Sequence, residues 1–136
     1  MANNSSGIPT SLKPFLVVSD CSGAISFYQH AFGAVVTERF EHTNGRVNGT
    51  LEIDGASFHV GDEEEENGNL SPKTIGGSPV RMILVTSDPD SIFAKAIAAG
   101  ATEICPVTVE ESWKIGKLLD PFGHTWEIGH KLPDSH

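Results

Sequence analysis

Hydrophobic residues follow a strand-like, then helical, then strand-like pattern through the first half of the chain. An apolar, β-branched run at Leu12–Ser19 precedes Asp20, a favourable helix N-cap, and apolar residues then recur at helical spacing up to Gly33. Three further strands are predicted at Val35–Phe40, Arg46–Ile53 and Ala56–Gly61. The turns between them contain Asn44-Gly45 and Asp54-Gly55, which are typical of β-hairpins. The first half therefore predicts the order β-α-β-β-β.

The second half repeats this order. Val80–Thr86 predicts a strand, and either Asp88 or Asp90 can cap a helix that ends at Gly100. Strands are expected at about Thr102–Val107, Trp113–Leu119 and His124–Gly129. Between the halves, residues 62–79 contain an acidic run and several Gly and Pro residues, which favours a linker.

Sequence identity between the halves supports a repeat. Lys13–Asp20 returns as Arg81–Asp88, with four identities in eight positions, and at the same offset of 68 residues Gly55–Asp62 matches both glycines of Gly123–His130. A period near half of the chain indicates two copies of one supersecondary unit. Because 136 residues are too few for two independent cores, the copies must share a core or complete each other across a dimer.

Charge and cysteine content exclude some kinds of partner and site. Eighteen acidic residues against nine basic ones give a net charge of −9, which argues against nucleic acid as a partner. The acidic run Asp62–Glu66 is interpreted as a solvated loop that repels itself, with attraction of a cationic ligand as the alternative. Cys21 and Cys105 have no metal-ligand or disulfide spacing and are interpreted as ordinary packing residues.

No targeting or membrane segment is evident. Residues 1–11 are polar and are expected to form a flexible lead-in, and residues 131–136 are expected to form a tail. The N-terminus lacks the features of a secretory signal, and no apolar stretch approaches the roughly 20 residues of a membrane span. We therefore expect a cytoplasmic protein without a membrane partner.

Several motifs fit one known family. They are Phe27-Tyr28, Ala31–Ala34, Ala98–Thr102, Ser71-Pro72, Gly76–Pro79 and Asp120–Trp126. On these motifs the chain resembles the vicinal oxygen chelate (VOC) superfamily of glyoxalase I, bleomycin resistance proteins and extradiol dioxygenases, and its PhnB-like branch in particular. The resemblance implies an α+β fold in which two βαβββ repeats form half-barrel cups. It implies one domain at 12–130, with repeat one at 12–61, an acidic linker at 62–79 and repeat two at 80–130.

The resemblance also implies where a site would lie. In the superfamily, four strand positions point into the cavity and carry the metal in the metal enzymes. These positions are Lys13, His59, Arg81 and Glu127 here. The repeat supports the assignment independently, because Lys13 and Arg81, and likewise His59 and Glu127, are 68 residues apart. Strand alternation also places His59 and Glu127 on the face opposite the predicted core.

Two of these four residues are unsuited to a metal ion. The ammonium of Lys13 and the guanidinium of Arg81 donate no lone pair at neutral pH, so only His59 and Glu127 would remain as ligands. We therefore expect no metal cofactor, with a divalent metal as the alternative. The cations could instead bind a ligand carboxylate or phosphate, or form internal ion pairs of Lys13 and Arg81 with Glu127. His59 could be a hydrogen-bonded structural residue, a ligand contact or a general base.

Further candidates line the same expected cavity, whereas two other polar residues are interpreted as structural. The additional ligand-binding candidates are Phe15, Asn48, Thr50, Ile83 and Trp113. His124 is expected to belong to a turn and Tyr28 to a helix face.

The sequence leaves three functions open. The first is a homodimeric, metal-free protein that encloses a small organic molecule, as bleomycin resistance proteins do. The second is a metal-dependent lyase, isomerase or dioxygenase of the glyoxalase type. The third is an interaction module with a filled cavity. Fold resemblance does not choose among them, because function depends on the site.

Overall fold

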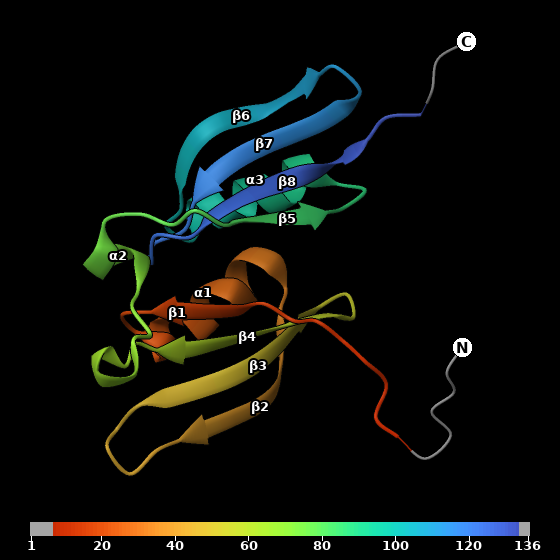
Figure 1. Ribbon diagram of the computed structural model, residues 1–136. Coiled ribbons are helices and arrows are strands. Elements are labelled where there is room, and N and C mark those ends of the chain that lie inside the picture. Colours follow the sequence, from red (N-terminus) through yellow and green to blue (C-terminus); the bar gives the residue numbers. More distant parts are fainter. Residues whose placement is uncertain (1–6, 134–136) are drawn as a thin grey trace.

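The computed structural model of the chain describes residues 7–133 and contains two βαβββ units (Figure 1). The first unit consists of β1 (Phe15–Val18), α1 (Cys21–Phe32), β2 (Val35–Glu41), β3 (Val47–Ile53) and β4 (Ala56–Asp62). The second consists of β5 (Arg81–Val85), α3 (Pro89–Ala98), β6 (Thr102–Glu110), β7 (Trp113–Leu119) and β8 (Thr125–Lys131). The predicted α+β fold and the order of its elements are confirmed.

Each unit forms a four-stranded sheet of the same topology. The strand orders are β1-β4-β3-β2 and β5-β8-β7-β6, and in both sheets the first strand runs parallel to the last while the hairpins are antiparallel. The registers also correspond: Phe15 lies opposite His59 in the first sheet, and Ile83 lies opposite Glu127 in the second. The offset of 68 residues is therefore a structural equivalence.

Helix ends follow the capping chemistry of the sequence. The Asp20 side chain accepts a hydrogen bond from Gly23 N–H at the start of α1, and Asp88 does the same for Ser91 N–H at the start of α3. This resolves the alternative between Asp88 and Asp90 in favour of Asp88. Gly33 ends α1 at a φ of 68°, a left-handed conformation that glycine adopts without strain.

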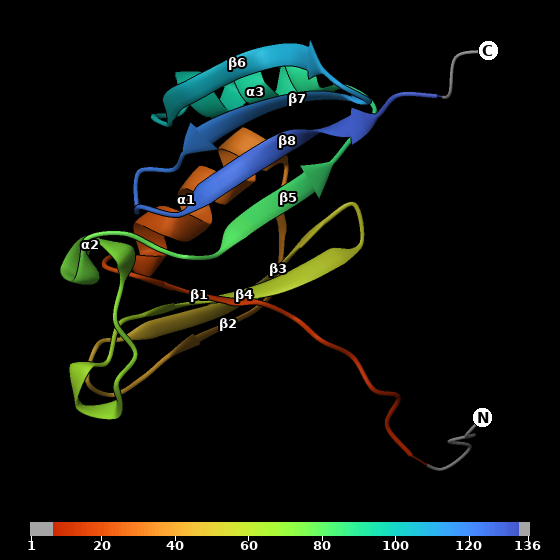
Figure 2. The same ribbon diagram turned by 45° about the horizontal axis from the view of Figure 1, so that its top comes forward.

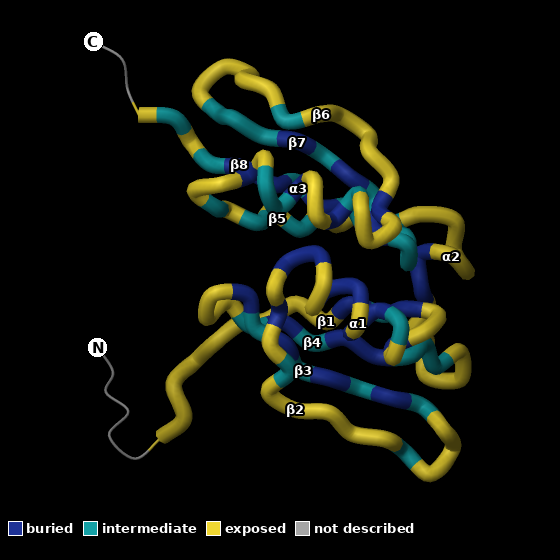
Figure 3. The backbone as a smooth tube through the Cα atoms, turned by 180° about the vertical axis from the view of Figure 1, so that it is seen from behind, coloured by how far each residue is buried: buried dark blue, intermediate teal, exposed yellow. Residues whose placement is uncertain are grey.

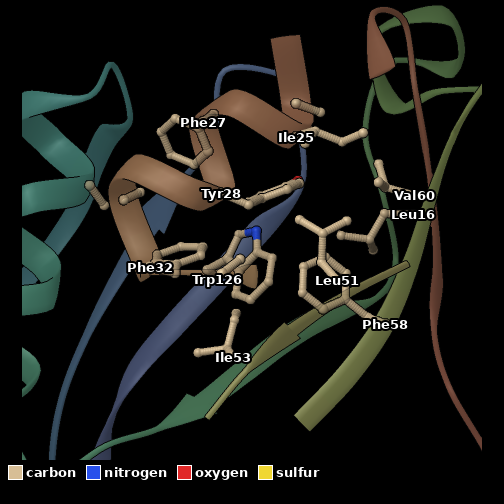
Figure 4. Packing of buried hydrophobic residues seen from close by; sticks show 14 of the residues in the cluster. Leu16, Ile25, Phe27, Tyr28, Phe32, Leu51, Ile53, Phe58, Val60 and Trp126 are labelled. Atoms are coloured by element: carbon tan, nitrogen blue, oxygen red, sulfur yellow. The ribbon is translucent and has the colours of Figure 1, made fainter. Parts of the chain in front are cut away.

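The two repeats share one hydrophobic core. Helices α1 and α3 pack against each other and lie between the sheets (Figures 1 and 2). Trp126 of β8 reaches into the first repeat, with its ring centroid 4.6 Å from that of Phe32, 5.5 Å from Tyr28 and 5.9 Å from Phe58 (Figure 4). Only 2% of Trp126 is exposed. Of the two arrangements that the sequence left open, a shared core is therefore present within one chain.

The segment between the repeats is more ordered than a solvated linker. It contains a 3₁₀ turn at Glu65–Asn67 and the short helix α2 (Pro72–Ile75). Asp62 still belongs to β4, and its carboxylate accepts hydrogen bonds from Cys21 N–H at 2.7 Å and Val47 N–H at 2.9 Å.

Three more carboxylates of the acidic run, those of Glu63, Glu64 and Glu66, also have partners. Glu63 accepts hydrogen bonds from Ser71 N–H and the Thr74 hydroxyl. Arg46 Nη1 lies 2.6 Å from Glu66 and 3.4 Å from Glu64, and its hydrogen bond lowers the Glu66 pKa to about 2. Glu65 and Glu66 are exposed, as a solvated loop predicts, and Arg46 with the neutral donors adds local order that the sequence did not predict.

Several element bounds differ from the predictions. β1 begins at Phe15, so Lys13 lies in the segment before it, while β6 continues to Glu110 and β8 to Lys131. Outer strands β2 and β6 are mostly exposed (Figure 3). Cys21 is buried as expected, but Cys105 on β6 is exposed and is not a packing residue.

Residues 7–14 are exposed and form no helix or strand. Residues 1–6 of the expected lead-in and residues 134–136 of the expected tail lie outside the described residues. No helix within residues 7–133 is long and apolar enough to cross a membrane.

Candidate functional site

Each sheet has one face against the helices and one face without a helix, which we call its free face. On β3, Leu51 and Ile53 are buried against the helices, whereas Thr50 and Glu52, which alternate with them, are partly exposed on the free face. On β4, Phe58 is likewise buried and His59 is partly exposed on the free face. The predicted alternation, with Phe58 in the core and His59 on the opposite face, is confirmed.

The free face of the first sheet holds an aromatic ring stacked beside an imidazole. The ring centroids of Phe15 and His59 are 6.0 Å apart with an interplanar angle of 27°. Thr50 Oγ1 lies 3.0 Å from His59 Nδ1, so this nitrogen is hydrogen-bonded within the protein. His59 therefore presents only Nε2 to a ligand or a metal ion.

Gly61 leaves room for two of the predicted residues. A Cβ placed at Gly61 would lie 2.7 Å from Phe15 Cζ and 2.9 Å from Asn48 Oδ1. The Phe15 ring and the Asn48 amide therefore meet over the bare backbone of Gly61. Asn48, Thr50, His59 and Phe15 form one contiguous group, as the registers of β1, β3 and β4 require.

The free face of the second sheet is charged and carries a pocket. Arg81 Nη1 lies 2.8 Å from Glu127 Oε2, and the Glu127 side chain is only 16% exposed. Beside this ion pair is an open pocket of about 720 Å³. It is lined by Ile83, Glu110, Glu111, Trp113, Ile115 and Glu127.

The four residues expected to converge are divided between the sheets. His59 lies on the first free face, whereas Arg81 and Glu127 lie on the second. Of the two ion pairs considered, Arg81 with Glu127 is present. Lys13, also a described residue, forms no ion pair with Glu127 within 4.0 Å, because it precedes β1 on the other repeat.

Sequence reasoning missed Glu110, Glu111 and Ile115 in the pocket. Ile115 has the strand parity of Trp113, and this signal could have identified it. Glu110 and Glu111 could not be placed while the strand was expected to end at Val107. Glu110 pairs with Trp113 across a tight hairpin, in which Glu111 has a φ of 54°.

The residues present do not fit a divalent metal ion. Among residues 7–133, no group of three or more His, Cys, Asp or Glu side chains is placed to hold one. One nitrogen of His59 is bonded to Thr50, and Glu127 is paired with Arg81. A metal would have to displace the Arg81 guanidinium, which also repels it.

Tyr28 and His124 have structural roles, as interpreted from the sequence. Buried Asp120 accepts hydrogen bonds from the Tyr28 hydroxyl at 2.5 Å, Trp126 Nε1 at 3.0 Å and His124 N–H at 3.0 Å. Burial, and then the Asp120 carboxylate, raises the Tyr28 pKa well above its ordinary value of 10.0. His124 Nε2 also bonds the Val17 carbonyl at 2.8 Å, which ties repeat two to β1.

Comparison with known proteins extends this description. Residues 81–128 match the family model described as the glyoxalase At5g48480-like C-terminal domain. The chain is 34% identical over 131 residues to the uncharacterized protein Mb0911c of Mycobacterium bovis, covering 92% of this chain and 86% of that protein. It is 33% identical over 134 residues to the uncharacterized protein At5g48480 of Arabidopsis thaliana, covering 90% of this chain and 80% of that protein.

Solved structures agree in fold. The Arabidopsis thaliana At5g48480 structure has a TM-score of 0.70 at 33% identity, covering 90% of this chain and all of that one. The fosfomycin resistance protein FosX from Listeria monocytogenes, complexed with Mn(II) and sulfate, has a TM-score of 0.68 at 13% identity, covering 91% of this chain and 93% of that one. The chain therefore belongs to the At5g48480-like glyoxalase family of the VOC superfamily.

Proposed function

We propose that this protein binds a small organic molecule on its free sheet faces without a metal ion. The observation that carries the proposal is the 720 Å³ pocket of the second sheet, in which Ile83, Trp113 and Ile115 supply apolar surface and three glutamates supply polar groups. This volume lies in the range of roughly 300–1,000 Å³ that is usual for small-molecule sites.

The donor set supports binding without a metal. Arg81 and Lys13 occupy two of the positions that carry metal in metal-dependent members of the superfamily, and Arg81 pairs with Glu127. FosX, described with Mn(II), shares the fold at 13% identity, and this identity carries no ligand set over to this chain. The competing proposal is a metal-dependent enzyme of the glyoxalase type that uses His59 Nε2 and Glu127.

A second copy of the chain would complete the cavity. Helices α1 and α3 fill the space between the sheets, so the two free faces of one chain do not face each other (Figure 2). Both carry exposed apolar side chains: Phe15 is 51% exposed, Ile83 53% and Val85 62%. Apolar surface of this kind on a sheet marks an interaction site. In a twofold dimer, His59 and Lys13 of one copy would lie opposite Arg81 and Glu127 of the other.

A thermal-shift screen of small molecules on chelator-treated protein tests the binding function. We expect at least one compound to raise the melting temperature, because a ligand that binds only the folded state stabilises it. Trp113→Ala should abolish that shift while keeping the unliganded melting temperature within a few degrees. Shifts that require added Mn²⁺, Ni²⁺ or Zn²⁺, and that disappear in His59→Ala, would establish the metal-dependent alternative instead.

Sedimentation equilibrium tests the dimer separately. We expect a species of twice the 14.5 kDa chain mass at micromolar concentration. Phe15→Asp should weaken this dimer because it places a charge on the free face. Gln29→Glu adds the same charge at an exposed position of α1 and should not weaken it. A monomer at high micromolar concentration would contradict the proposal.

A further inference from the structure

The free face of the first sheet presents flat side chains in a fixed arrangement. The Phe15 ring stacks beside the His59 imidazole, and the Asn48 amide meets the same ring over Gly61. Thr50 bonds His59 Nδ1 and so fixes the orientation of the imidazole. This group offers aromatic surface together with hydrogen-bonding groups at its edge.

Apart from His59, the group contains no titratable side chain. Phe15 and Asn48 carry no charge, and His59 is hydrogen-bonded to a neutral hydroxyl. Two carboxylates lie on the same face: Glu38 is across from Thr50 on the far side from Phe15, and Glu52 is two residues from Thr50 along β3. The second free face differs, because its equivalent positions carry Ile83 and the Arg81–Glu127 ion pair.

Flat conjugated rings are the partners that this arrangement recognises best. Half of Phe15 is exposed, so it can stack with another ring, and aromatic pairs contribute beyond the area that they bury. The Asn48 amide has one acceptor oxygen and two N–H donors, and it can pair with another amide in the plane of such a ring. A saturated ring loses the stacking, and a charged edge loses water without gaining a counter-ion from Phe15, Asn48 or Thr50.

We infer that the free face of the first sheet recognises a planar, uncharged ring bearing an amide-like edge, through Phe15, Asn48 and His59. This inference rests on the proposed function, because it names the class of molecule that binds there. Thr50 is a positioning residue that acts through His59. Gly61 sets the specificity, because any side chain at this position would displace the Phe15 ring.

A matched set of probes tests the inference on the intact 136-residue chain. Benzamide and cyclohexanecarboxamide share the amide and differ in planarity, while benzoate and benzylamine share the ring and add a charge of either sign. Binding is followed by amide ¹H–¹⁵N spectra, which report separately on Gly61 and the Asn48 side chain and on the indole of Trp113. We expect benzamide to shift the Gly61 and Asn48 signals and to bind at least fivefold tighter than the other three probes.

Substitutions check that the group acts as described. Phe15→Ala and Gly61→Ala should each weaken benzamide binding at least threefold. Val109→Ala is the control, because it removes an exposed apolar side chain from the helix side of the second sheet. Val109 pairs in register with Lys114, whose ammonium reaches Asp90 on that side. This substitution should leave binding unchanged. Thr50→Val should weaken binding less than Phe15→Ala and should shift the His59 ring signals in the unliganded protein.

Three results would overturn the inference. They are equal binding of cyclohexanecarboxamide, tighter binding of benzoate or benzylamine at Gly61, and an absence of benzamide shifts at Gly61 and Asn48. Shifts confined to Trp113 would overturn it while the proposed function stands, since the pocket of the second sheet would then be the binding site. The thermal-shift screen decides the proposed function independently of these four probes.

Discussion

Gly129→Ala tests whether the close approach of β7 and β8 depends on a missing side chain. A Cβ at Gly129 would lie 2.1 Å from the Lys114 carbonyl oxygen and 2.6 Å from Ile115 Cα. An ordinary contact begins near 3.4 Å, so the strands would have to separate locally by about 1.3 Å, the difference between 3.4 and 2.1 Å. Overpacking of this kind costs about 1–3 kcal/mol, and a disrupted ladder hydrogen bond adds roughly 1 kcal/mol. We therefore expect a loss of about 2–4 kcal/mol in the free energy of unfolding.

The equivalent glycine of the other repeat is the control. Gly61 is also crowded, but its nearest atoms are the ends of the Phe15 and Asn48 side chains, which can rotate away. Gly61→Ala should therefore cost less than about 1 kcal/mol. Urea unfolding of wild type, Gly129→Ala and Gly61→Ala at the same protein concentration measures both losses in unfolding free energy. A Gly129→Ala protein as stable as wild type, or a Gly61→Ala protein destabilised as much as Gly129→Ala, would refute the reasoning.

Three further predictions concern the core and the thiols. Asp120→Asn should destabilise the fold by about 2–4 kcal/mol, because one buried carboxylate accepts from several donors, whereas Tyr28→Phe should cost only about 1–2 kcal/mol; urea unfolding at pH 7 compares them. Burial raises the pKa of Tyr28 well above 10.0 and that of Cys21 from 9.0 to about 12. Because the unfolded chain loses these protons at lower pH than the folded chain, the free energy of unfolding should fall as pH rises above 9. The slope is up to about 1.4 kcal/mol per pH unit for each group. Above pH 10 the fall should be steeper in wild type than in Tyr28→Phe. A thiol reagent should modify one cysteine of the native protein and two in urea, and Cys105→Ser should abolish the native reaction; rapid native modification of Cys21 would contradict its burial.

Most of the fold could be predicted because its signals are local. Asp20 and Gly33 bound α1, and turns such as Asp54-Gly55 separate the strands, so the element order follows from capping and turn chemistry. The pairing of equivalent strands followed from the repeat of 68 residues. The order of the acidic segment could not be predicted in this way, because Arg46 and Thr74, which bind its carboxylates, lie outside the run in sequence.

The candidate site was predicted in part. Alternation along β4 correctly placed His59 opposite the core, since a strand has a period of two. The expected meeting of His59 with Glu127 depended instead on how the sheets pack across α1 and α3, which no local pattern encodes. The strain at Glu111 and the continuation of β6 to Glu110 also depend on the hairpin with Trp113.

The position of Trp126 has a consequence for synthesis of the protein on the ribosome. Its indole fills the space among Tyr28, Phe32 and Phe58, so the first repeat has an incomplete interior until the end of the chain has been made. Translation adds roughly 5–20 residues per second, so the stretch between Asp62 and Trp126 takes about 3–13 s. During that interval the faces of Tyr28 and Phe32 that Trp126 covers remain unpacked on the nascent chain. A translational pause within the second repeat would prolong this exposure and favour aggregation or chaperone capture before folding.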